Sequence, residues 1–288
     1  MSRAETQHLG LFSEQELDGI QPSGSPWVIS DDDPATVPVP LQTVIVKVDG
    51  PYTERDRKLW VFLLHTVFDE LGEKPIHSLP IREVNAIFRE LGGEHDTKWI
   101  WDSAKRLAKT TVEWETTFDD GRFEQGISSM FGANISKKAR QMGTLTFNFP
   151  PLLIPIIKQP TRFARLRVHF LLKLSGKYSV TLYEILEGFA NRRDGRCTVT
   201  IDDLRTWLKV PEDTYPTWKN FRLRVLDPAI KQINDDPYGA GFSVEYTPIR
   251  KGRFYHEIVF QLTKTAKRIQ TDSLIKKNAG DARKIKAA

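Results

Sequence analysis

The spacing of hydrophobic residues predicts one strand and three helices in the first part of the chain. Residues 41–49 (LQTVIVKVD) have the composition of a β-strand, and over residues 52–71 apolar side chains recur at the spacing of a helix with one buried face. A second helix is expected over residues 81–91, directly after Pro80 and before two glycines. A third helix, with a polar residue able to cap its start, is expected over residues 97–109.

Two β-rich runs follow the third helix. They are residues 110–118 (TTVEWETTF) and 145–149 (LTFNF), and a polar stretch with several glycines separates them. We expect these runs to pair as a hairpin with a long tip. Three helices followed by a hairpin are the order of elements in a winged helix.

The same order returns after a proline-rich boundary at residues 150–160. The predicted elements are helices at 168–174 and 178–190, a strand at 197–201, helices at 201–208 and 218–234, and strands at 242–249 and 255–262. Pro228 is expected to bend or break the long helix, because proline cannot donate a backbone N–H. The last two strands flank the tight turn 250–253 and form a second wing. The pattern therefore predicts an α+β fold of two tandem, pseudo-symmetric winged-helix domains.

A length of 288 residues suits two domains, since one domain takes on the order of 100 to 150 residues. We place the first domain at residues 41–150 and the second at residues 151–263. Residues 1–40 are acidic, rich in Pro, Ser, Gly and Asp, and expected to be disordered. Residues 264–288 form a basic tail.

The charge distribution favours a polyanionic partner. The net charge is +5 and the isoelectric point is about 9.1. Residues 1–40 hold one Arg against seven Asp and Glu, whereas residues 264–288 hold eight Lys and Arg against two Asp. A basic body with a more basic tail suits phosphates, because Lys and Arg displace condensed counterions from them. A soluble protein with a lysine-rich end would explain the charge equally well.

Composition also bears on the compartment. The chain has one cysteine, Cys197, which permits neither an internal disulfide nor a cysteine-built zinc site. No stretch approaches the roughly 20 apolar residues of a membrane helix, and the first residues lack the layout of a signal peptide. We expect a cytoplasmic protein that does not contact a membrane.

The 218–234 helix carries the residue types that read bases in a major groove. In a helix-turn-helix relative, the last helix before the hairpin lies in that groove. Lys219 and Arg222 share a face of this helix, and Asn220 and Arg224 flank it. Arg can bind guanine with two hydrogen bonds, and Asn can do the same with adenine. The alternative is a solvated cationic helix face, which is common in globular proteins.

The predicted second wing adds to this evidence. Arg250, Lys251 and Arg253 surround Gly252 at its tip, where a type I′ or similar turn would hold three positive side chains in solvent. Two basic elements, the helix and the wing, then point at one ligand. The sequence therefore predicts a double-stranded DNA interface in the second domain.

The first domain repeats this arrangement in a weaker form, because Asp102 interrupts its basic helix face. The candidate DNA-binding residues there are Lys98, Lys105, Arg106 and Lys109 on the third helix, and Lys137 and Lys138 in the hairpin region.

Signals for catalysis are missing from the sequence. Gly176-Lys177 is not a nucleotide-binding P-loop, because Leu171 and Tyr178 occupy the places of the required Gly and Ser or Thr. The histidines are scattered without the paired spacing of a metal site, which also argues against a nicking enzyme. We expect no cofactor, no metal and no enzymatic activity.

Three stretches resemble the iteron-binding replication initiators of bacterial plasmids. They are LKLSGKYSVTLYEILEGF, VTIDDLRTWLKVPEDTYPTWKNFRLRVLDPAIKQIN and FSVEYTPIRKGRFYHEIVFQL, and together they cover about a hundred residues. The resemblance implies two winged helices that bind successive major grooves of repeated origin sequences, or iterons. It also implies monomers that open the origin, dimers that repress their own gene, and contacts with a host replicative helicase and host initiator.

A short motif in the acidic segment suggests a further partner. Gln7, Leu9, Leu11 and Phe12 resemble the motif by which bacterial replication proteins bind the sliding clamp. A flexible segment that inserts an apolar pair into a pocket needs few residues. A chance match is the competing explanation.

Two functions remain for a chain of this kind. The first is a plasmid replication initiator that binds repeats, promotes origin opening and recruits host proteins. The second is a dedicated transcriptional repressor with tandem winged helices. DNA binding alone does not separate them, whereas an initiator needs extra contacts of the kind that the clamp-like motif could supply.

Overall fold

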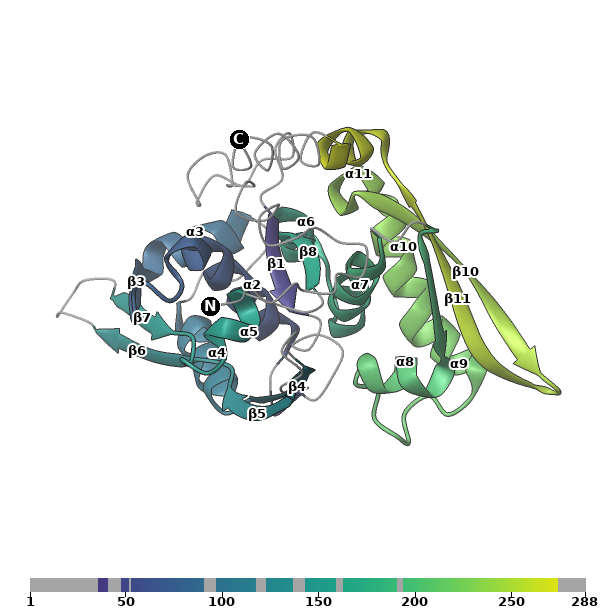
Figure 1. Ribbon diagram of the computed structural model, residues 1–288, viewed down its shortest axis with the longest axis horizontal. Coiled ribbons are helices and arrows are strands. Elements are labelled where there is room, and N and C mark those ends of the chain that lie inside the picture. Colours follow the sequence, from purple (N-terminus) through teal and green to yellow (C-terminus); the bar gives the residue numbers. More distant parts are fainter. Residues whose placement is uncertain are drawn as a thin grey trace.

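The computed structural model describes residues 36–40, 48–51, 53–90, 97–117, 123–136, 143–158, 163–190 and 194–273. These residues form two lobes, with the first half of the chain on the left of Figure 1 and the second half on the right. Helices α6 (Val168–Lys173) and α7 (Lys177–Phe189) lie between the lobes.

The first lobe contains the helices that the hydrophobic pattern predicted. Its helical segments are α2 (Glu54–Val67), η2 (Phe68–Glu70), α3 (Ile81–Glu90) and α4 (Lys98–Ala108). The backbone N–H of Thr53 donates to the Asp56 carboxylate at 2.7 Å, which satisfies a donor at the start of α2.

Four aromatic rings join α2 to the strands of this lobe. Trp60 meets Phe149 edge-on at 5.5 Å between ring centroids, and Phe131 stacks on Phe147 at 5.6 Å. The indole N–H of Trp60 donates to the carbonyl of Met130 at 3.0 Å, so the buried indole has a polar partner.

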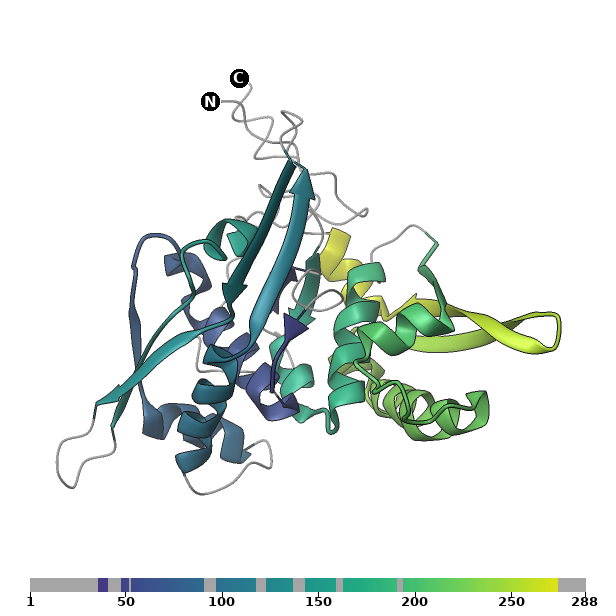
Figure 2. The same cartoon turned by 90° about the horizontal axis from the view of Figure 1, so that it is seen from below.

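The strands of the first lobe form two sheets. One has the order β3-β7-β6, from β3 (His77–Pro80), β7 (Thr144–Asn148) and β6 (Gly132–Ser136). The other has the order β2-β4-β5, from β2 (Val48–Asp49), β4 (Thr111–Thr117) and β5 (Phe123–Ser129). Figure 2 shows the β4–β5 hairpin pointing in a different direction from the β6–β7 hairpin.

This arrangement corrects the predicted first wing. The runs 110–118 and 145–149 do not pair with each other, because the stretch between them supplies a strand for each: β5 pairs with β4, and β6 pairs with β7.

Gly126 shows why a glycine occurs within β5. A Cβ atom there would lie 2.3 Å from the ring of Trp114, its partner in the ladder, so only glycine lets the indole cross the strand.

The segment before the first lobe is also more ordered than predicted. Residues Thr36–Pro40 form β1, which pairs antiparallel with β8 (Phe163–Arg167), although residues 1–40 were expected to be disordered. β1 is one of only two strands in this sheet, so its prolines can turn their donor-free side away from β8. β1 also contacts α2 and the short helix α5 (Ile154–Lys158).

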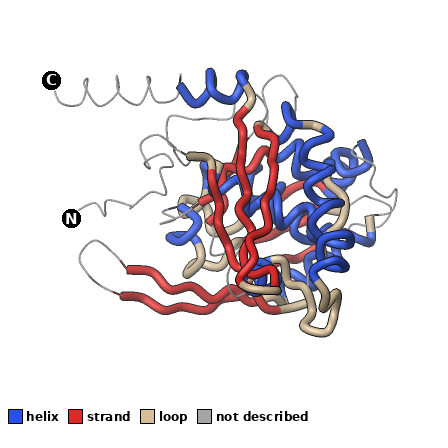
Figure 3. Tube along the Cα trace, turned by 90° about the vertical axis from the view of Figure 1, so that its right-hand side faces the viewer, coloured by secondary structure: helices blue, strands red, loops and turns tan. Residues whose placement is uncertain are grey.

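The second lobe has a three-stranded sheet in the order β10-β11-β9, seen at the front of Figure 3. Its elements are β9 (Arg196–Thr200), α8 (Ile201–Trp207), α9 (Trp218–Phe221), η3 (Arg222–Leu226), α10 (Asp227–Asp235), α11 (Pro237–Ala240), β10 (Phe242–Lys251) and β11 (Phe254–Lys264). The strands and the helices α8, α9 and α10 lie where the pattern predicted them, β10 and β11 extend farther than expected, and α11 was not predicted.

A buried ion pair connects the first lobe to α7. The guanidinium of Arg57 on α2 lies 2.8 Å from the carboxylate of Glu184, and both side chains are 2% exposed. The amine of Lys209, which follows α8, is close enough to interact with both. Burial and the charge of Arg57 lower the pKa of Lys209 to about 7, while Glu184 opposes this shift.

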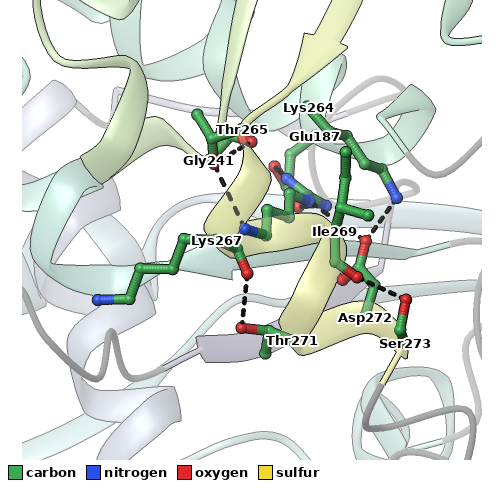
Figure 4. Close-up of polar contacts among 10 residues, drawn as sticks. Glu187, Gly241, Lys264, Thr265, Lys267, Ile269, Thr271, Asp272 and Ser273 are labelled. Carbon is green, nitrogen blue, oxygen red and sulfur yellow. Dashed lines mark hydrogen bonds and ion pairs between the residues drawn. The ribbon is translucent and has the colours of Figure 1, made fainter.

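The predicted basic tail begins inside the fold. Residues 266–273 are helical, and the Arg268 guanidinium donates two hydrogen bonds, of 2.7 and 2.6 Å, to the buried Glu187 carboxylate on α7. Lys264 also bonds Asp272 at 2.5 Å, as Figure 4 shows. Residues 264–273 are therefore anchored to the second lobe, because a buried carboxylate requires a paired charge.

The described ranges contain neither a helix that could span a membrane nor a cluster of metal-ligating side chains. None of the helices there is long and apolar enough to cross a membrane. Nor do His, Cys, Asp and Glu residues of those ranges gather in a group of three or more that could hold a metal ion.

Candidate nucleic-acid interface

Arg205 organises the turn between α8 and α9, although no sequence pattern singles it out. Its guanidinium donates to backbone carbonyls of the 211–215 turn, the shortest bond being 2.7 Å, and lies 5.3 Å from the ring centroid of Phe221. The Thr217 hydroxyl then accepts a bond from the backbone N–H of Asn220 at 3.3 Å and caps α9. Arg205 thus positions the start of the helix that follows.

The four predicted base-reading residues are all exposed on the helical segment formed by α9 and η3. Lys219, Asn220, Arg222 and Arg224 are all exposed, whereas Phe221 between them is 1% exposed and belongs to the core. The side chains of Lys219 and Arg224 make no hydrogen bond or ion pair with any other described residue. Their charges are therefore available to a ligand.

The helix continues through Pro228 by means of a π turn, η3. Pro228 cannot donate to the carbonyl four residues earlier, and the turn before it widens. The backbone N–H of Asp227 instead donates to the carbonyl of Arg222, five residues back. The predicted bend or break is thus replaced by one wide turn, and this turn carries Arg222 and Arg224.

Arg222 is oriented by Asp227, whose carboxylate is held by a tyrosine of the sheet. Its guanidinium lies 3.3 Å from the carboxylate of Asp227, and this carboxylate accepts a 2.7 Å hydrogen bond from the Tyr246 hydroxyl on β10. Burial and the hydrogen bond to Asp227 raise the pKa of Tyr246, so its hydroxyl stays protonated and donates. Arg222 is 44% exposed, which leaves it within reach of a ligand.

Aromatic contacts fix the wing against the same helix. Tyr255 on β11 packs on Trp218 at the start of α9, with 5.1 Å between ring centroids. The Arg250 guanidinium lies 4.4 Å from the ring centroid of Tyr255 and donates to its hydroxyl at 2.7 Å. Tyr255 therefore joins the wing to the helix, and Arg250 holds the Tyr255 ring as well as adding positive charge.

The tip of this wing is a two-residue turn. Gly252 has a φ of +66°, and Arg253 is not among the described residues with positive φ, so of the tight turns expected here, type I′ or similar, the structure has type II′. Lys251 and Arg253 are exposed and make no ion pair with other described residues. Both cations of the tip thus face solvent.

The basic residues of the first lobe are more constrained. On α4, Lys105 pairs with Asp102 at 2.7 Å, while Lys98 and Lys109 are exposed. In Figure 1, α4 and α9 both lie toward the lower side of the molecule, and the β6–β7 and β10–β11 hairpins point to opposite ends.

Arg106 has a structural partner that the sequence did not reveal. Its guanidinium makes two bonds, of 2.6 and 2.7 Å, to the buried carboxylate of Asp56 on α2. The hydrogen bond to Asp56 raises the pKa of Arg106 above its ordinary value. Arg106 therefore attaches α4 to α2, and its side chain remains 33% exposed.

The remaining candidate residues lie outside the described ranges. These are Lys137 and Lys138 of the first hairpin, and Gln7, Leu9, Leu11 and Phe12 of the clamp-like motif.

Comparison with known proteins identifies relatives of both lobes. A family model described as "Initiator Replication protein, WH1" matches residues 42–187, and one described as "Initiator Rep protein, WH2" matches residues 200–262. The two matches leave residues 188–199 uncovered, and the predicted boundary at residue 150 stays a prediction. No curated protein sequence matches the chain.

Two solved structures of domains 2 and 3 of RctB also match the chain. One, of a selenomethionine derivative, is 11% identical, with 73% of this chain and 82% of that chain covered and a TM-score of 0.43. A second is 11% identical, with 75% and 83% covered and a TM-score of 0.41.

Proposed function

Because the chain belongs to the Rep replication initiator family, with both of its winged-helix domains, we propose that it starts replication by binding repeated origin sequences in double-stranded DNA. The observation that carries this proposal is the exposed surface of α9 and η3, with the basic wing fixed beside it by Tyr255 and Trp218. A helix and a wing held in one geometry can engage a groove and its phosphates together.

The second domain reads sequence in this proposal. Arg222 and Asn220 have the donors and acceptors that recognise guanine and adenine in the major groove. Lys251 and Arg253 bind phosphates, which supply affinity on any sequence. Because Asp227 and Tyr246 orient Arg222, its guanidinium is partly placed before DNA arrives.

The first domain makes the lesser contribution. We propose that Lys98, Lys105 and Lys109 on α4, with Lys137 and Lys138, contact the backbone of a neighbouring groove. Arg106, which is 33% exposed beside its ion pair with Asp56, joins them. These contacts extend the footprint without adding much sequence preference.

Self-association has a candidate surface on β5. This strand is at the edge of its sheet, and Phe123 and Ile127 on it are 59% and 58% exposed. An exposed edge strand can pair with a second copy of itself. We propose that dimers formed there repress the gene, while monomers bind iterons and promote origin opening.

The same proposal assigns host partners. The initiator recruits the replicative helicase and the host initiator, and residues 7–12 bind the sliding clamp. A dedicated transcriptional repressor would need none of these contacts. Deleting residues 1–35 distinguishes the two, because an initiator that recruits the clamp loses plasmid copy number while a repressor keeps its full effect.

A footprint on the DNA that flanks the encoding gene tests the function. We expect protection of phased direct repeats, and loss of protection with Arg222→Ala. Lys231→Ala is the matched control, because this exposed cation lies on the same helix but pairs with Asp235 at the far end. Protection of one inverted repeat at the promoter alone would favour the repressor, and no protection at all would overturn both functions.

A further inference from the structure

Phe254 at the tip of the second wing is unusually exposed. Its exposed fraction is 79%, the largest among the large hydrophobic residues of the described ranges. It pairs with Lys251 in the ladder and follows Arg253, and its ring contacts no other described aromatic or cationic group. Binding phosphates needs only the two cations, so the ring requires another explanation.

The wing presents this ring in a defined direction. The register of β10 and β11 shifts between Ile249 and Arg250. Arg250 therefore opposes Tyr255, and His256 has no opposite residue in the ladder. Such a bulge re-aims the side chains beyond it. Tyr255 faces Trp218 on α9, and Phe254, the next residue along the strand, therefore lies on the opposite side of the ribbon.

We propose that Phe254 is a wedge that inserts at a base step from the minor groove, with Lys251 and Arg253 on the flanking phosphates. This inference rests on the proposed DNA-binding function. Apolar side chains of minor-groove proteins part base steps in this way, and an aromatic ring can stack on any base it meets. The cations keep the tip at the backbone while the ring enters the stack.

The wedge would add sequence preference without a base hydrogen bond. Pyrimidine–purine steps unstack more readily than others, so Phe254 would favour one of them under the wing. The DNA would also bend at that step. Arg222 and Asn220 would then read one part of the repeat, and Phe254 would test the deformability of another.

Base-stacking fluorescence tests the wedge directly. The probe is a duplex from the flanking DNA that the wild-type protein binds, with 2-aminopurine placed in turn at each purine. We expect fluorescence to rise at one step on binding, and Phe254→Ser to abolish this rise and weaken binding about tenfold, as the loss of one stacked base would. Phe254→Leu keeps an apolar wedge and should retain part of the signal.

The control variant and the contrary outcomes distinguish an error in the wedge from an error in the proposed DNA-binding function. Tyr238→Ala removes another exposed aromatic ring, 70% exposed on α11, and should leave affinity and fluorescence unchanged. If Phe254→Ser binds with an unaltered fluorescence rise, the wedge is wrong while DNA binding stands. If it loses only cooperativity between adjacent repeats, the ring contacts a second copy of the protein, which also overturns the wedge. If the wild type binds no flanking duplex, the proposed function itself fails.

Discussion

Replacing Arg268 with alanine should lower the free energy of unfolding by about 3 to 5 kcal/mol, the range for breaking one partner of a buried ion pair. The Arg268 and Glu187 side chains are 3% and 1% exposed, so neither is screened by solvent. Burial alone would lower the pKa of Arg268, but Glu187 and Asp272 raise it above its ordinary value. Without Arg268, Glu187 would remain buried with its main charge partner removed.

The loss in the free energy of unfolding comes from the charge of Glu187 left without its partner, and not from the lost contact itself. Replacing both partners with apolar residues of similar size, as in Arg268→Met with Glu187→Leu, should therefore cost about 1 kcal/mol or less. A chain ending after Thr265 should be destabilised as much as Arg268→Ala. A chain ending after Ser273 keeps the anchor and serves as its matched control.

Urea unfolding followed by tryptophan fluorescence measures these differences, provided that the slope with denaturant is the same for all variants. A loss below about 1 kcal/mol for Arg268→Ala would contradict the reasoning, because the pair would then act like an exposed one. A double variant as unstable as the sum of the single ones would contradict it too, since independent effects add.

Three further predictions concern DNA binding and pH. Arg222→Ala should cost about 1 to 3 kcal/mol on the preferred site and less on altered ones, and equal losses on all sequences would exclude base reading. Lys251→Ala with Arg253→Ala should weaken binding to every sequence and flatten the salt dependence by about two units, and an unchanged slope would show that the wing does not touch phosphates. Lys209 binds a proton less readily when folded, so the free energy of unfolding should rise from pH 7 to 10.5 in the wild type and rise less in Lys209→Met, as urea titrations across this range would show.

The architecture was largely predictable because local patterns determine it. The hydrophobic spacing located the helices of both lobes, and the family comparison confirms two tandem winged-helix domains. The second wing was found because its strands are adjacent in sequence and a glycine turn joins them. In each case the pattern is formed by residues that are close together in the sequence.

The first wing was predicted wrongly because β5 and β6, which lie in a polar stretch with glycines, were not recognised as strands. The other differences concern partners that are distant in sequence. The pairing of β1 with β8 joins residues more than a hundred positions apart, and a proline-rich segment gives no local sign of it. The ion pairs of Arg106 with Asp56 and of Arg268 with Glu187 give no sign in the sequence, because the two carboxylates lie on other helices. Charge in a sequence does not reveal burial, so structural and ligand-binding arginines look alike.

The sequence predicted which helix and which hairpin carry the candidate site, but it did not predict how the single residues are held. The exposed residues on α9 and η3 follow from helical periodicity, but the π turn, the contact of Tyr246 with Asp227 and the exposure of Phe254 depend on how the sheet packs. Arg205 gave no signal because its partners are backbone carbonyls.

The π turn also bears on how the recognition surface can change by insertion and deletion. A π turn corresponds to an α-helix with one extra residue, and Leu223 within it is 44% exposed, so the core does not require it. Deleting this residue would restore regular α-helical bonding and leave Lys219 and Asn220 on the same side of the helix relative to α10, since the wide turn already absorbs the extra residue. Phe221 would then stay in the core, and a single codon lost at this place would remove one side chain from the recognition surface without remaking the domain beneath it.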